Sequence, residues 1–341
     1  MKSRPVRELG ENRVVSRFRA LASATLGPNV VVGPGDDAAV LRVSDERLLL
    51  LACDMMVQEI QFRLEWAEPR QIGWKAMVAN LSDIAGMGGE PAAAVASLGV
   101  PGDLPEEVAA GIAEGLVTAA SRYRTSFVGG DLVGSPGPVI VDVAIMGWVE
   151  PANLLRRSGA KPGDVLCVTG RLGASAAGLV ARRHGLEEAN SSLLAEALRA
   201  HHEPIPRLPE ARSIAGSHLA SAMMDLSDGL AEDLPRLCGE SGVGARLRAE
   251  AIPIHRACSR VANQLGLNDL NLAITGGEDY ELLFTCPPEV VSELSVAVLE
   301  ATGTAITVIG ETVAEEEVTL LDLDGMEQPL GRGFDHFAAP S

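Results

Sequence analysis

Short apolar strands alternate with long amphipathic helices along the chain, which limits the fold to a small set of mixed architectures. Residues 46–53, ERLLLLAC, predict a buried strand that ends at Asp54. Residues 69–88 predict a helix that begins with a proline and ends at the glycines of GMGGEP. Residues 105–124 predict a second helix, and residues 138–150 an alternating strand. The first half therefore combines a sheet with long helices.

The second half has the same mixture, after a turn-rich passage, EPANLLRRSGAKPGD, at residues 150–164. Strand-to-helix turns follow in TGRLGASAAGL and in AMMDLSDGLAEDL, and two helical stretches lie near residues 187–215. A chain of 341 residues is long for one hydrophobic core. We therefore predict an α+β protein of two domains, residues 1–152 and residues 153–341.

The charge balance excludes several classes of partner. The chain has 28 basic and 46 acidic residues, a net charge of −18. Such a chain repels nucleic acids and anionic membranes, and its first 15 residues carry no apolar signal segment. Five widely spaced cysteines without a Cys-x-x-Cys pair are typical of reduced core thiols. We expect a soluble, cytoplasmic protein that binds neither nucleic acid nor membrane.

Only three of the basic residues are lysines, so an anionic substrate would need another source of positive charge. Acidic residues recur at the ends of apolar strands or in Gly/Ser turns: Asp36, Asp37, Asp54, Asp83, Asp131, Asp225 and Asp228. Carboxylate oxygens are the ligands that Mg²⁺ prefers, and a bound cation relieves the repulsion of adjacent charges. Each aspartate alone could be an ordinary turn or cap residue. Together they favour a metal and phosphate site.

Familiar nucleotide and hydrolase motifs are missing from the sequence: there is no P-loop, no kinase His-Arg-Asp loop and no Gly-x-Ser-x-Gly elbow. TGRLGASAAG is similar to a phosphate-binding turn at a helix N-terminus, although such turns often serve packing alone. We expect His201 and His202 to lie in a solvated polar loop.

Eight stretches, in order, resemble the thiamine-monophosphate kinases, a family within the superfamily of PurM-like ATP-binding proteins related to aminoimidazole-ribonucleotide synthetase. GGEDYEL and NLSDIAGMG are the most specific, whereas GDDA and SDG occur across the superfamily. The stretches cover the chain from end to end: GDDAAV (35–40), CDMMVQEIQF (53–62), IGWKAMVANLSDIAGMGGEP (72–91), FVGGD (127–131), RSGAKPGDVLCVTGRLGASAAGL (157–179), MDLSDGLAEDL (224–234), TGGEDYELLFT (275–285) and GFDHF (333–337).

The resemblance implies transfer of the ATP γ-phosphoryl group onto the phosphate of thiamine monophosphate, with several Mg²⁺ ions. It also implies a homodimer whose N-terminal sheets pair in a shared barrel. Carried over by position, the metal ligands would be Asp36, Asp54, Asp83, Asp131, Asp225 and Asp228. Gly130, Asp131, Arg157 and Ser227 would contact ATP, while Gln61, Glu278 and Phe334 would contact the acceptor. No general base is needed, because the attacking group is already a phosphate oxygen.

Three positions depart from the family pattern. Ala52 and Cys53 stand where the family usually has Ser-Thr, which removes one hydroxyl and substitutes a softer thiol. Gln61 stands where the family has a substrate-contacting histidine. Two alternatives therefore stay open, namely another ATP enzyme of the superfamily and a binding protein without turnover. An acidic Ca²⁺-buffering protein is disfavoured, since no EF-hand spacing occurs.

Overall fold

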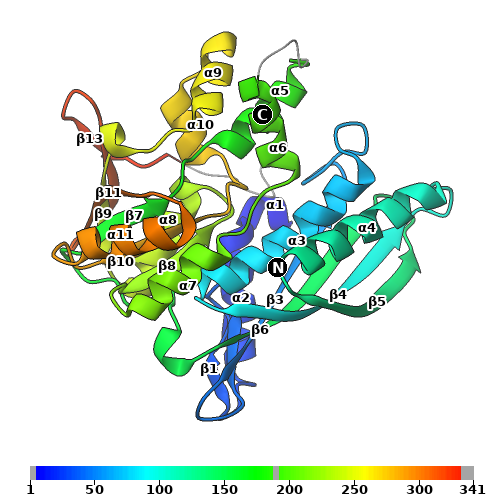
Figure 1. Cartoon of the computed structure of the whole chain (residues 1–341), viewed down its shortest axis with the longest axis horizontal. Coiled ribbons are helices and arrows are strands. Elements are labelled where there is room, and N and C mark those ends of the chain that lie inside the picture. Colours follow the sequence, from blue (N-terminus) through cyan, green and yellow to red (C-terminus); the bar gives the residue numbers. More distant parts are fainter. Residues whose placement is uncertain (1–4, 187–191, 332–341) are drawn as a thin grey trace.

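The computed structural model describes residues 5–186 and 192–331, which form two β-sheets with their covering helices (Figure 1). The first sheet has six strands, and only its β4–β5 pair is parallel. In spatial order they are β1 (Val30–Val32), β2 (Ala39–Arg42), β3 (Leu48–Val57), β6 (Ile140–Val149), β4 (Glu90–Val100) and β5 (Ser126–Gly134).

The inner face of the first sheet packs on helix α3 (Pro69–Gly86), which in turn packs on α4 (Glu106–Arg122). A capping box between Glu68 and Gln71 fixes the start of α3. The two helices cross closely because Gly73 and Gly115 carry no side chain: a Cβ there would lie 1.9 Å from the carbonyl oxygen of Ile112 and 2.0 Å from that of Arg70. Helices α1 (Val6–Leu9) and α2 (Glu11–Ser23) precede the sheet.

The outer face of the first sheet carries exposed apolar side chains, next to a polar row of Ser97, Asp131 and Asp142. Strand pairing places on it the side chains of Leu51, Met55, Val95, Val133 and Met146, which are 39% to 60% exposed. Isolated apolar side chains are common on protein surfaces, but a contiguous apolar sheet face is typical of an interaction surface. The predicted dimer barrel would use this face.

The second sheet has seven strands, all paired antiparallel except β12 with β9. In spatial order they are β13 (Glu327–Pro329), β12 (Val318–Leu321), β9 (Gly244–Arg248), β11 (Ile306–Val313), β7 (Val165–Thr169), β10 (Glu281–Cys286) and β8 (Ala222–Leu226). The helices around it are α5 (Ala174–Arg183), α6 (Ser192–His202), α7 (Leu208–Ser217), α8 (Leu230–Ser241), α9 (Arg256–Leu265), α10 (Asp269–Thr275) and α11 (Val291–Thr302). Short 3₁₀ turns lie at η1 (Pro151–Asn153) and η2 (Ala249–Ala251). The predicted α+β class is confirmed.

Helix α3 joins the two halves of the molecule (Figure 1). It contacts β3 and β6 on one side, and α7 and β8 of the second half on the other. Thirteen of its residues are buried, so it is covered by other elements on nearly every side. One hydrophobic cluster accordingly runs from Leu81 and Ile84 of α3 to Met223 and Phe284 of the second sheet. Within the described ranges, every helix is too short or too polar to traverse a bilayer.

Candidate active site

A cluster of carboxylates lies where the C-terminal half of α3 meets the end of β8. Asp36 and Asp37 come from the turn between β1 and β2, Asp83 from α3 and Asp225 from β8. The hydroxyl of Ser82 donates to Asp225 Oδ2 at 2.6 Å, which ties the helix to the strand. Four sequence-predicted acidic positions, counting Asp37, thus converge from both halves of the chain.

Gly86 allows Asp37 to approach α3. A Cβ at this position would lie 2.1 Å from Asp37 Oδ2 and 3.0 Å from the backbone nitrogen of Asp225. Any side chain at residue 86 would therefore push the Asp36–Asp37 turn away from the helix. The glycine in the sequence DIAGMGG keeps two acidic segments in contact.

Burial and mutual repulsion dominate the electrostatics of the cluster. Burial raises the pKa of Asp83 well above its usual value, and the charges of Asp54 and Asp225 raise it further. Burial likewise raises the pKa of Asp225, with a further contribution from Asp37, against the hydrogen bond from Ser82. Carboxylates crowded in this way are unfavourable as anions unless cations compensate them.

Arg157 supplies part of that compensation. Its Nε and Nη2 donate to Asp37 Oδ1 at 2.9 and 2.5 Å, and its backbone N–H donates to Asp36 Oδ1 at 3.2 Å. Burial nevertheless raises the pKa of Asp36 to about 6, helped by the charge of Asp37. The second oxygen of Asp37 is buried and has no hydrogen-bond partner among the described residues. An unpartnered buried carboxylate oxygen is costly, and a hard cation would satisfy it.

The donor set therefore fits a divalent cation, because it consists of carboxylate oxygens with a hydroxyl beside them. Within the described ranges, no three His, Cys, Asp or Glu side chains are already arranged to hold a metal ion. The side chains would have to draw together around an ion. Their raised pKa values reflect the same crowding.

Asp54 is on the inner face of β3, in line with buried Ala52 and Met56. Its backbone N–H donates to Asn80 Oδ1 of α3 at 3.1 Å. Its charge contributes to the raised pKa of Asp83. Asp54 therefore belongs to the cluster, whereas Cys53 points to the outer face of the sheet. Burial raises the pKa of the Cys53 thiol, so it is a poor metal ligand here.

Asp131 and Gly130 lie apart from the cluster within one chain. Strand β5 is separated from β3 by β6 and β4, about 14 Å at the usual strand spacing. Asp131 pairs with Ser97, which places its side chain on the outer face, opposite to Asp54. A Cβ at Gly130 would lie 1.8 Å from the carbonyl oxygen of Ala96, so this glycine is needed for strand pairing.

Asp228 has an internal partner. Arg236 of α8 donates from Nη1 to Asp228 Oδ2 at 2.6 Å and to Asp233 Oδ1 at 3.0 Å. Asp233 also accepts the backbone N–H of Asp228 at 3.0 Å. Ser227 lies in the same loop, between β8 and α8. The loop is thus held in place by side chains of the helix that follows it.

The GGEDYEL segment carries two strained residues, Glu278 and Tyr280, with φ values of 66° and 51°. The side chain of Asp279 between them accepts the backbone N–H groups of Gly173 and Ser175 at 2.6 and 3.2 Å. It therefore caps α5, and the TGRLGASAAG turn serves packing rather than leaving an open anion site. Burial raises the pKa of Tyr280, and the charges of Glu278 and Asp54 raise it further.

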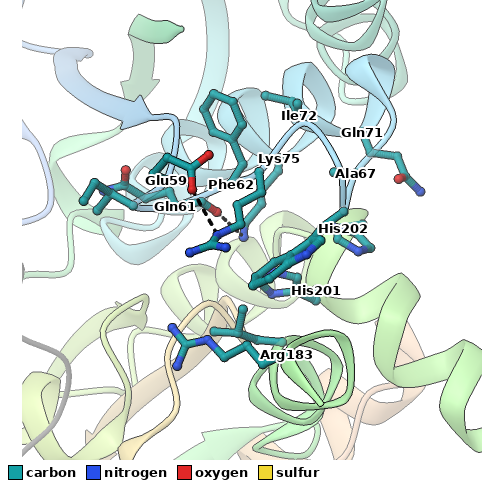
Figure 2. Close-up of a pocket in the computed structure, with 14 residues that line it drawn as sticks. Glu59, Gln61, Phe62, Ala67, Gln71, Ile72, Lys75, Arg183, His201 and His202 are labelled. Carbon is teal, nitrogen blue, oxygen red and sulfur yellow. Dashed lines mark hydrogen bonds and ion pairs between the residues drawn. The ribbon is translucent and has the colours of Figure 1, made fainter. Parts of the chain in front are cut away.

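A cavity of about 50 Å³ opens beside this segment, between the loop before α3 and helices α5 and α6 (Figure 2). That volume corresponds to roughly three to five waters. Gln61, Lys75, His201 and His202 line it. The side chain of Gln61 accepts the backbone N–H of Val57 at 2.8 Å, so it also stabilises its own loop.

The expectation that the two histidines are solvated was wrong. His201 and His202 are the last residues of α6 and are 4% and 6% exposed. They continue the buried stripe of Leu194, Ala197 and Leu198, which is the signal that could have placed them. Burial lowers the pKa of His202 to about 3, so it is neutral near pH 7. Phe334 lies outside the described residues.

Comparison with known proteins identifies the family. The AIR synthase related protein N-terminal and C-terminal domain families match residues 35–149 and 161–322. A thiamine-monophosphate kinase of Salmonella typhimurium is 34% identical over 97% of this chain and 99% of its own. The chain belongs to the thiamine-monophosphate kinase family.

Solved structures agree with this family. The structure described as AaThiL complexed with AMPPCP and TMP superposes with a TM-score of 0.85 at 28% identity, over 98% of this chain and 100% of that one. The hydrogenase maturation protein HypE of E. coli has a TM-score of 0.69 at 20% identity, over 95% of this chain and 99% of its own. The latter likeness concerns the fold alone.

Proposed function

We propose that this kinase transfers the γ-phosphoryl group of ATP onto the phosphate of thiamine monophosphate, giving thiamine diphosphate and ADP. The carrying observation is that segment 276–280 adjoins both the cavity, through Glu278, and the carboxylate cluster, through Tyr280. Glu278 contacts two residues that line the cavity, and its charge acts on Tyr280 together with those of Asp54, Asp83 and Asp225. An acceptor with its ring in the cavity would have its phosphate near the cluster.

Asp36, Asp54, Asp83 and Asp225 would hold Mg²⁺, and Asp37 joins them because its second oxygen has no partner. Bound Mg²⁺ neutralises charge on the transferring phosphoryl group and lowers the repulsion between two anionic substrates. The protein's own contribution is to hold donor and acceptor in line. This positioning suffices because the attacking phosphate oxygen needs no general base.

Arg157 and Ser227 would contact the phosphates of ATP. Arg157 presents a planar fork, which matches phosphate as well as carboxylate geometry. In the structure this fork is bound to Asp37. Arg157 would have to leave Asp37 to bind ATP, and Asp37 could then hold a metal ion. Asp228 would become a metal ligand in the same way, by exchanging Arg236 for the ion.

The acceptor would be recognised by Gln61, Glu278 and Phe334, as the family resemblance implies. Gln61 keeps a hydrogen-bonding group where the family has histidine. Its side-chain oxygen is already bound to Val57, so the amide nitrogen is the group that would meet the acceptor.

A homodimer in the cytoplasm completes the proposal. The outer face of the first sheet offers a contiguous apolar surface to a second copy. Asp131 and Gly130 lie on the edge strand of this sheet, away from the cluster of their own chain. The second copy would bring Asp131 into a site. Four buried thiols agree with a reducing compartment.

The test is a product assay with purified protein, ATP, Mg²⁺ and thiamine monophosphate, with free thiamine in a parallel reaction. We expect thiamine diphosphate from the monophosphate alone. Asp83→Asn and Asp225→Asn should each lower turnover more than about 100-fold, since metal stabilisation of the transition state amounts to several kcal/mol. Asp103→Asn, an exposed aspartate, serves as the control.

The departures at Ala52, Cys53 and Gln61 motivate a second candidate, a nucleotide-binding or thiamine-phosphate-binding relative without turnover. Tight ATP binding with no ADP in either reaction would favour it. Product from another acceptor would instead favour a different ATP enzyme of the superfamily.

A further inference from the structure

The carboxylate of Glu278 is held from both halves of the molecule. Lys75 of α3 approaches Glu278 Oε1 to 2.5 Å, and His201 Nδ1 of α6 approaches Oε2 to 3.3 Å. The Lys75 side chain is 4% exposed and that of Glu278 is 22% exposed. Each oxygen therefore has its own partner, and the partners come from different domains.

The main chain leaves Glu278 little freedom of its own. Its φ of 66° is in the left-handed region, and its N–H donates to the carbonyl of Ser227 at 2.7 Å. This strained backbone fixes the direction in which the Glu278 side chain leaves the main chain. The contacts with Lys75 and His201 fix the position of its carboxylate.

Both partners are themselves fixed. Lys75 Nζ also donates to the carbonyl of Gln61 at 3.4 Å, and His201 Nδ1 lies 3.2 Å from the hydroxyl of Ser175. The His201 ring packs edge-on against that of His202, with 4.9 Å between centroids. Lys75, His201 and His202 all line the cavity (Figure 2). The position of Glu278 is thereby coupled to the cavity wall.

The surroundings of Glu278 and His201 also determine their protonation states. Burial would raise the pKa of Glu278, but Lys75 and the hydrogen bond from His201 outweigh it and lower the pKa to about 2. Burial lowers the pKa of His201, helped by the charge of Lys75, so the imidazole is neutral near pH 7. Lys75 and Glu278 compensate each other, and Glu59, Arg63 and Arg183 also line the cavity.

We propose that Lys75 and His201 are positioning residues for the acceptor, which hold the Glu278 carboxylate between the cavity and the carboxylate cluster. This inference rests on the proposed function, because it assigns Glu278 to acceptor recognition. It extends that function by naming two residues, Lys75 and His201, that act through Glu278. Neither residue takes part in ATP binding in this proposal. A merely structural ion pair between the domains would affect both substrates alike.

The experiment is calorimetric titration of the full-length protein, first with thiamine monophosphate and separately with the Mg²⁺ complex of a non-hydrolysable ATP analogue. We expect Lys75→Met to weaken acceptor binding about 10- to 100-fold, the range for losing a charged hydrogen bond. Binding of the ATP analogue should change less than about threefold. Lys161→Met, which removes an exposed lysine, is the matched control.

Two further comparisons separate positioning from general damage. His201→Asn retains a donor near Nδ1 and should bind the acceptor better than His201→Leu. Lys75→Met combined with Glu278→Gln should bind the acceptor no worse than the weaker single variant, because both act on one carboxylate. Additive losses, or equal losses for acceptor and ATP analogue, would overturn the proposal.

Failure of the proposed function gives a different pattern. If wild-type protein binds thiamine monophosphate but forms no thiamine diphosphate, the proposed function is rejected. The titrations then still test whether Lys75 and His201 position Glu278. If wild-type protein does not bind thiamine monophosphate, both proposals are rejected. If Lys75→Met does not fold, two other comparisons test the positioning proposal. One is His201→Asn against His201→Leu. The other is the Lys75→Met/Glu278→Gln double variant, which leaves no unpaired charge.

Discussion

Arg157 binds one oxygen of Asp37 with two nitrogens and leaves the other oxygen, which is buried, without a partner among the described residues. The side chain of Asp37 is fully buried and that of Arg157 is 17% exposed. The pair thus joins the Asp36–Asp37 turn of the first half to the start of the second. It stabilises the ligand-free protein and occupies groups that the proposed reaction requires.

Arg157→Gln should destabilise the protein measurably in the absence of divalent cations. Removing one partner of a buried ion pair costs about 3–5 kcal/mol, which lowers the melting temperature by roughly 4–7 °C in a chain of this size. Adding Asp37→Asn should restore at least half of the loss, since no unpaired charge then remains. Thermal unfolding in EDTA measures both variants.

Arg246→Gln is the control for this comparison, because Arg246 pairs with Glu311 and Glu327 at the exposed surface. Its loss should change stability by less than about 1 kcal/mol. An Arg157→Gln variant as stable as this control would mean that Asp37 is not charged in the ligand-free protein.

Stabilisation by Mg²⁺ should increase with pH. A carboxyl group whose pKa is raised by folding stabilises the protein below its unfolded pKa, and this contribution is lost as pH rises through the folded value. For Asp36 the loss falls between its ordinary 3.8 and about 6, and Asp83 and Asp225, whose pKa values burial also raises, contribute in the same direction. Without metal, these groups therefore lower stability as pH rises. A bound cation reverses this effect.

The measurement is the difference in melting temperature with and without saturating Mg²⁺, at about pH 5.5 and about pH 8. At 100-fold excess over the dissociation constant, binding contributes about 2.7 kcal/mol, or roughly 4 °C, and we expect the difference near this size only at the higher pH. Asp225→Asn should reduce it, whereas Asp103→Asn should not. A pH-independent difference would argue against Mg²⁺ binding by these carboxylates.

Local patterns in the sequence predicted the elements and the acidic cluster well. Asp54 and Asp225 lie in or at buried strands and Asp83 lies on α3, because strand and helix periods are encoded by nearby residues. The contact between Asp233 and Arg236 could also have been found, since the two residues are three positions apart on α8, with Asp228 just before that helix.

Contacts between distant segments could not be predicted in this way. The ion pair of Lys75 with Glu278 joins residues 203 positions apart, and α6 brings His201 to the same carboxylate. The separation of Asp131 from Asp54 depends on the non-sequential strand order β3-β6-β4-β5, which periodicity does not reveal. Tertiary packing decided each of these.

Gly130 should be required for strand pairing whether or not it touches ATP. A Cβ at residue 130 would lie 1.8 Å from the Ala96 carbonyl oxygen, so Gly130→Ala must displace β5 from β4. Overpacking of this kind costs about 1–3 kcal/mol, or roughly 1–4 °C in melting temperature. Gly134→Ala on the same strand meets no atom within 4 Å and should be near neutral. Unchanged stability of Gly130→Ala with weakened ATP binding would instead identify a direct ATP contact.

The outer face of the first sheet should control assembly and, through it, activity. Met146 is 39% exposed at the centre of this face, beside Leu51. Met146→Lys places a charge there, which is compatible with a solvated monomer but not with a buried apolar interface. We expect light scattering to give twice 35.6 kDa for wild-type protein and 35.6 kDa for the variant. Kinase activity should fall together with the molecular mass, because Asp131 would no longer reach a site.

Leu323→Lys, at a 79% exposed apolar position outside this face, should remain dimeric and active. A monomeric wild-type protein with full activity would show that one chain forms the whole site, and that Asp131 is not part of it.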